Sequence, residues 1–125
     1  MTSAYFERLD ESTFRPTEHV GGAWVENEQH IAPSFGLIAH EIERHRDARR
    51  DDTLPLGRVS YDILGPVPVE PVEVRVEVLR PGRTVELVQA TLAHAGRPVV
   101  LARAWLMAGY DTAAIAGGGL DRIPA

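Results

Sequence analysis

The sequence predicts an α+β domain in which a curved antiparallel sheet wraps around one central helix. Two observations carry this prediction: apolar side chains recur at helical spacing between residues 31 and 42, and several runs after residue 57 alternate with a period of two. The first half of the helical segment is apolar or small on nearly all sides, so strands should cover more than one side of it. We expect one domain over residues 1–110 and a flexible tail over residues 111–125.

The helix is expected over residues 33–48. Pro33 suits a first helical turn, and from His40 onwards polar side chains dominate. The first half should therefore be buried, and the second half should face water. The apolar residues at helical spacing are Ile31, Phe35, Ile38 and Ile42.

Strands are expected on both sides of the helix. Two short ones lie near residues 4–9 and 12–16, and four longer ones follow at 58–65, 72–78, 84–93 and 98–108. The alternation is most regular where valines at 72, 74, 76 and 78 are separated by charged residues. Turns at Pro81-Gly82 and Ala95-Gly96 predict an antiparallel meander. Another α+β sheet that packs one helix also fits this pattern.

Composition excludes several classes of function. The net charge is −5, which disfavours nucleic acid as a partner. The thirteen basic residues are all arginine and there is no cysteine, so lysine chemistry, thiolate chemistry and cysteine-ligated zinc are excluded. His40 and His45 are five apart rather than four, which disfavours a helical zinc site. We expect a cytoplasmic protein with no metal, no cofactor and no membrane span.

Four segments carry motifs that agree in order and separation: residues 14–24, residues 29–43, residues 59–68, and residues 76–87 with Arg80-Pro81-Gly82-Arg83. Together they resemble the thioesterase-like (acyl-CoA thioesterase II type) hot-dog superfamily, and in particular its N-terminal hot-dog half. The resemblance runs from residue 5 to residue 107. It implies the hot-dog fold, hydrolysis of an acyl-CoA or acyl-carrier thioester, a homodimer, higher homo-oligomer or tandem double hot dog, and a pantetheine channel beside the helix.

The chain departs from that family in two respects. Members are commonly about twice as long, and their second half carries the Asp, Ser/Thr and Gln associated with catalysis. The Gln position falls near Leu106 here, and the helix carboxylate of other hot-dog thioesterases falls at Ala39, counted from His30. These departures favour an alternative: a non-catalytic acyl or acyl-CoA binding module, or the inert subunit of a heteromeric double hot dog. A hot-dog dehydratase is a third alternative, but the sequence presents no clear His–Asp pair for it.

Three residues are candidates for catalysis. Asp62 stands in a mostly apolar strand, where a carboxylate could act as general base or as nucleophile, or could face solvent in phase with Ser60. Gln29 and His30 directly precede the helix. They could orient water while free N–H groups of the first helical turn form an oxyanion hole, although His30 could also only cap the helix.

Three further residues are candidates for substrate binding. Ser34 lacks the G-x-S-x-G setting of a nucleophile, so we assign it to binding. Arg80 and Arg83 flank the Pro-Gly turn, where they could bind the phosphates of CoA or remain solvated charges.

Overall fold

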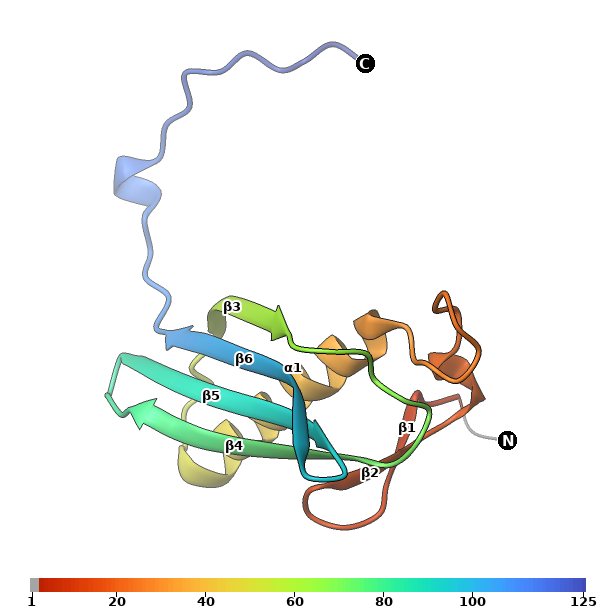
Figure 1. Ribbon diagram of the computed structural model, residues 1–125. Helices are drawn as coiled ribbons and strands as arrows, with labels where there is room; N and C mark the ends of the chain where they lie inside the picture. Colours follow the sequence, from red (N-terminus) through yellow and green to blue (C-terminus); the bar gives the residue numbers. More distant parts are fainter. Residues whose placement is uncertain (1–2) are drawn as a thin grey trace.

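The structure is a computed structural model that describes residues 3–125. One long helix packs against a six-stranded antiparallel sheet whose strand order is β1-β2-β4-β5-β6-β3 (Figure 1). The elements are β1 (Phe6–Arg8), β2 (Thr13–Pro16), the short 3-10 turn η1 (Glu18–Val20), α1 (Ile31–Arg49), β3 (Leu56–Ile63), β4 (Val72–Arg80), β5 (Val85–His94), β6 (Arg97–Met107) and the 3-10 turn η2 (Ala113–Ile115). The predicted elements and the meander of the last three strands are confirmed.

Alternation along the strands separates an inner face, against the helix, from an outer face. The inner positions of β5 and β6 are almost fully buried, and three of them are alanines: Ala90 pairs with Ala102, and Ala104 pairs with Val88. The core consists of these residues and larger apolar ones, among them Leu37, Ile38, Ile42, Val72, Val74, Val88, Leu92, Val100 and Leu106. Burial of this apolar surface is the main stabilising contribution.

The helix is covered less completely than the sequence predicted. Leu37, Ile38 and Ile42 face the sheet and are buried, but Ala32 and Gly36 in the first half are exposed. The expectation that the first half is buried on all sides is therefore wrong. Because both exposed residues are small, they leave a depression beside the helix rather than a ridge.

Two arginines at the end of α1 hold a buried carboxylate on β5. Glu86 is 2% exposed, and its two oxygens accept from Arg49 at 2.5 and 3.2 Å. Arg50 lies 3.4 Å from Glu86 and also donates to the carbonyls of Gly82 and Arg83 in the β4–β5 turn. The bond from Arg49 is the main reason that the pKa of Glu86 is lowered. This network joins the C-terminal end of the helix to the sheet.

The chain leaves the sheet after β6, and residues 109–125 are exposed and extend away from the domain (Figure 1). The division at residue 110 and the flexibility of the tail stay predictions. Within residues 3–125, no helix combines the length and the apolar character needed to cross a membrane.

Candidate functional site

A groove of about 620 Å³ runs beside the first turns of α1. Ala32, Pro33, Gly36 and Leu37 of α1 line one side of it, and residues before and within β1 and around η1 line the other. Three histidines line it, and they come from separate parts of the chain: His19, His30 and His40. The groove combines apolar lining residues with imidazole groups, which suits an apolar ligand that carries one reactive polar group.

The N-terminus of α1 opens at this groove. His30 is the N-cap residue, its backbone N–H donates to the Val20 carbonyl at 2.8 Å, and its side chain makes no capping bond. The first-turn N–H groups of Ile31 and Ala32 have no acceptor within the helix, and Pro33 has no N–H. Two amides and the positive end of the helix dipole are thus available to a negative oxygen.

Gln29 holds the start of the helix in place. It is 5% exposed, its backbone N–H donates to the Val67 carbonyl, and its side-chain amide donates to the Pro68 carbonyl, each at 2.7 Å. Its Oε1 atom is buried and has no hydrogen-bond partner among the described residues. Gln29 therefore ties the segment before the helix to the segment before β4, and this fixes His30 at the rim of the groove.

Ser34 faces the core instead of the groove. It is fully buried on the same helical face as Ile38 and Ile42, and within the described part of the chain its Oγ has no hydrogen-bond partner. The neighbouring Phe35 turns towards β3, where its ring stacks on Tyr61 at 4.0 Å and its carbonyl accepts from the Tyr61 hydroxyl at 3.1 Å. Burial raises the pKa of Tyr61, so its hydroxyl stays a donor.

Asp62 lies on the outer face of the sheet. Tyr61 points towards the helix, and side chains alternate along a strand, so its neighbour Asp62 points away from the helix and is exposed. The two catalytic candidates Asp62 and His30 therefore lie on opposite faces of the sheet within one chain.

The two turn arginines are at the opposite end of the molecule from His30. Arg50, which follows the last residue of α1, contacts the carbonyls of Gly82 and Arg83, while Arg80 donates to the Val85 carbonyl at 2.7 Å. The helix between the two ends spans about 28 Å at 1.5 Å per residue. Arg80 and Arg83 thus do not share a site with His30 within one chain, and Arg80 helps to close its own turn.

Sequence reasoning did not find His19 and His40 as groove residues. His40 lies four residues beyond the exposed Gly36, so helical spacing could have placed it there. His19 reaches the groove through the packing of η1, for which the sequence has no local signal. In residues 3–125 no group of three or more His, Asp or Glu side chains is arranged to hold a metal ion.

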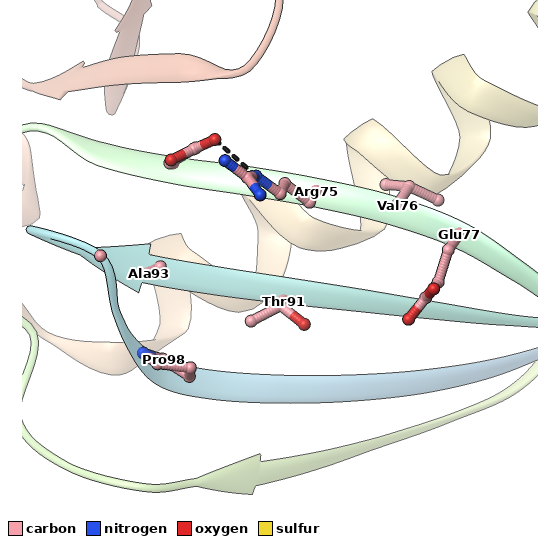
Figure 2. Close-up of a pocket in the computed structure, with 8 residues that line it drawn as sticks. Arg75, Val76, Glu77, Thr91, Ala93 and Pro98 are labelled. Atoms are coloured by element: carbon pink, nitrogen blue, oxygen red, sulfur yellow. Dashed lines mark hydrogen bonds and ion pairs between the residues drawn. The ribbon is translucent and has the colours of Figure 1, made fainter.

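A second hollow, of about 520 Å³, lies on the outer face over β4 and β5 (Figure 2). Its charged side chains already have partners: Arg75 donates to Glu73 at 2.6 Å, and Glu77 accepts from Gln89 at 2.9 Å. Among its lining residues there is no histidine and no helix terminus. The groove beside α1 is therefore the better candidate for chemistry.

Comparison with known proteins agrees with this architecture. Residues 21–107 match the family described as acyl-CoA thioesterase N-terminal domain. Among solved structures, a candidate thioesterase II from Thermobifida fusca is 22% identical with a TM-score of 0.64, and the match covers 98% of this chain and 44% of that one. The BH2602 protein from Bacillus halodurans, solved with CoA, is 10% identical with a TM-score of 0.68, and covers 76% of this chain and 64% of that one. Comparison with curated proteins found no match.

These structures confirm the hot-dog fold that the sequence predicted. A candidate thioesterase from Novosphingobium aromaticivorans is 17% identical with a TM-score of 0.70, and the match covers 96% of this chain and 47% of that one. The chain thus spans about half the length of the two longer proteins.

Proposed function

Because the chain belongs to the family of acyl-CoA thioesterase N-terminal domains, we propose that it hydrolyses an acyl thioester in the groove beside α1. The observation that carries the proposal is that His30 and Ala32 line this groove at the N-terminus of α1, where the N–H groups of Ile31 and Ala32 have no acceptor within the helix. The substrate is an acyl-CoA or an acyl-carrier thioester. The working unit is a homodimer or a higher homo-oligomer, in which two copies stand in for the two halves of a double hot dog.

In this mechanism the thioester carbonyl points at the first turn of α1. The N–H groups of Ile31 and Ala32 stabilise the oxyanion that forms when water attacks, and Pro33 limits the donors to these two. The His30 imidazole takes the proton of the attacking water. The carbon–sulfur bond then breaks, and the proton passes from the imidazolium to the departing thiolate, so that a free acid and a free thiol leave.

The remaining candidates have more limited roles. Gln29 positions His30 through its bonds to Val67 and Pro68. Ser34 and Asp62 do not line the groove. Asp62 can act on a thioester only in an assembly where the outer face of its sheet lies next to the thioester bound by another subunit.

The alternative is a non-catalytic acyl or acyl-CoA binding module, or an inert subunit of a heteromeric double hot dog. Two observations favour it. Leu106 is fully buried on the inner face and offers no hydrogen bond, and the groove has no carboxylate among its lining residues. The two proposals differ in turnover rather than in binding.

Release of free thiol from a panel of acyl-CoAs of increasing chain length separates these proposals. The hydrolase predicts turnover with at least one member, and His30→Ala should lower kcat about 100-fold or more, the usual contribution of a general base. His94→Ala is the matched control, since His94 lies outside the groove and pairs with Glu70. Binding of an acyl-CoA without release of free thiol would support the alternative, a non-catalytic binding module. Asp62→Asn, with folding and assembly intact, tests whether that carboxylate acts across an interface.

A further inference from the structure

The groove beside α1 has a direction that is defined by contacts at its two ends. At the start of the helix, the His30 N–H donates to the Val20 carbonyl of η1. About three turns further along α1, Glu41 accepts a hydrogen bond from Arg8 of β1 at 2.6 Å. The wall formed by η1 and β1 therefore runs alongside the helix, from the oxyanion donors at its N-terminus towards Glu41.

Gly36 keeps the middle of this groove open. Ala32, Gly36 and His40 follow one another at intervals of four, so they lie on one side of α1. A methyl group added at Gly36 would meet no other part of residues 3–125 within 4 Å, so local packing does not explain a glycine there. Glycine also destabilises the interior of a helix relative to alanine. What Gly36 contributes is the space that it leaves in the groove.

The far end of the groove is polar. His40 is the last residue of α1 that lines it, and this side chain is 69% exposed. Its Nε2 atom is 3.9 Å from a Glu41 oxygen, which is beyond hydrogen-bond distance. Glu41 is itself paired with Arg8 and with Arg44, which is 3.7 Å away. The His40 imidazole is therefore available to a polar group that arrives along the groove.

The distance from the oxyanion donors to His40 sets a chain length. Ala32 and His40 are separated by about 12 Å along the helix axis at 1.5 Å per residue. An extended hydrocarbon chain advances about 1.25 Å per carbon, so about eight to ten carbons cover this distance. The pantetheine arm suits this stretch less well, because its amide groups need hydrogen-bond partners. The side chains of α1 before His40 that line the groove offer none: Ala32, Pro33, Gly36 and Leu37.

We infer that the groove selects a medium-length acyl chain, of about eight to ten carbons, whose far end carries an oxygen as a hydroxyl or a carboxylate. The thioester carbonyl lies at the first turn of α1, the chain passes over Gly36, and the terminal oxygen bonds to the His40 imidazole. Gly36 and His40 then set the specificity, the first by leaving room for the chain and the second by binding its end. The inference rests on the proposed function for the position of the thioester, but it concerns selection of the acyl group rather than hydrolysis.

Calorimetric titration with non-hydrolysable thioether analogues of acyl-CoA tests the chain length independently of turnover. For the unmodified chain, the Kd should fall about two- to fourfold with each added methylene and stop falling near ten carbons. With Gly36→Leu the fall should end near five carbons, because Gly36 is about 6 Å from Ala32 along the helix axis. Gly36→Ala should have a smaller effect. Both replacements should raise the Tm, since each removes a glycine from an exposed helical position, so weaker binding would not reflect unfolding.

The terminal oxygen is tested with analogues of equal length that end in a methyl, a hydroxyl or a carboxylate group. An oxygen-ended analogue should bind the unmodified chain more tightly than the methyl-ended one. His40→Ala should raise the Kd of the oxygen-ended analogue about fivefold more than that of the methyl-ended one, the usual effect of one lost hydrogen bond. A gain confined to the hydroxyl or to the carboxylate would identify which group the site takes. Glu43→Ala is the matched control, since Glu43 is on the same helix but does not line the groove.

Three results would overturn the inference. A Kd that does not depend on chain length, or no binding of any analogue, would show that the groove does not hold the acyl chain. The second is a Gly36→Leu variant that still gains affinity up to ten carbons, and the third is a His40→Ala variant that weakens all analogues equally. Chain-length selection without thiol release from the matching thioesters would refute the hydrolase and leave the selection standing. Thiol release without any preference among lengths would do the reverse.

Discussion

Replacing Arg49 tests how much the buried carboxylate on β5 depends on the helix. Arg49→Met keeps much of the apolar stem but leaves Glu86, which is 2% exposed, with only the 3.4 Å contact from Arg50. Removing one partner of a buried ion pair commonly costs about 3–5 kcal/mol. Arg50 remains and Arg49 is 29% exposed, so we expect a smaller loss, about 2–3 kcal/mol in the free energy of unfolding.

Urea unfolding at pH 7.5 measures this loss. His45 accepts a hydrogen bond from Arg49 at 2.8 Å, and burial is the main cause of its lowered pKa, so at this pH the ring is neutral in the unmodified chain. Arg103→Met, an exposed change on the outer face, should stay within about 0.5 kcal/mol and serves as the control. Arg49→Met combined with Glu86→Leu should recover most of the loss, because no buried charge is then left unpaired.

The Arg49–Glu86 ion pair also predicts how the free energy of unfolding changes with pH. The pKa of Glu86 in the folded chain is lowered, so its contribution is present above the ordinary carboxyl value near 4.5 and disappears as the pH falls through the lower folded value. The stability gap between the unmodified chain and Arg49→Met should therefore narrow below pH 4.5. This reasoning would be refuted if the two proteins differed by less than about 0.5 kcal/mol in the free energy of unfolding at pH 7.5, or if the difference increased in acid.

Two further substitutions test local packing. Tyr61→Phe removes the hydroxyl that donates to the Phe35 carbonyl but keeps the stacked ring, so urea unfolding should show a loss of about 0.5–1.5 kcal/mol; no loss would mean that water replaces this bond without cost. Gly82→Ala places a methyl carbon 2.1 Å from the Val85 carbonyl oxygen, so the β4–β5 turn must shift and thermal unfolding should show a lower Tm. Gly65→Ala, where nothing lies within 4 Å, should leave the Tm nearly unchanged, and equal effects of the two would contradict the packing described here.

Local periodicity was sufficient to predict most of the fold. The alternation around Val72–Val78 placed β4, and the helical spacing from Ile31 to Ile42 placed α1, because each pattern reports which side of an element is buried. The same alternation within 84–93 places Glu86 in phase with Val88, and so already signalled a buried carboxylate that needs a cation. The exposure of Ala32 and Gly36 could not be predicted, since small residues are compatible with either environment.

The site was harder to predict than the fold because it depends on long-range packing. His30 and the first helical turn could be identified from their position before Pro33, and the structure places them at the groove. The opposite wall comes from residues near β1 and η1, whose approach depends on strand pairing across the domain. The side to which Asp62 points could not be predicted, because it depends on the register of β3. The sequence was compatible with an inward carboxylate and with an outward one in phase with Ser60.

The most direct test of the central claim is to locate a bound thioester analogue. Titration of the ¹⁵N-labelled chain with a non-hydrolysable acyl-CoA thioether, followed by amide NMR spectra, reports binding independently of turnover. The largest shifts should fall on the amides of Ile31 and Ala32 and on nearby groove residues such as Gly36. Shifts centred instead on Arg75 and Thr91 in the outer hollow, with the first turn of α1 unchanged, would contradict the central claim.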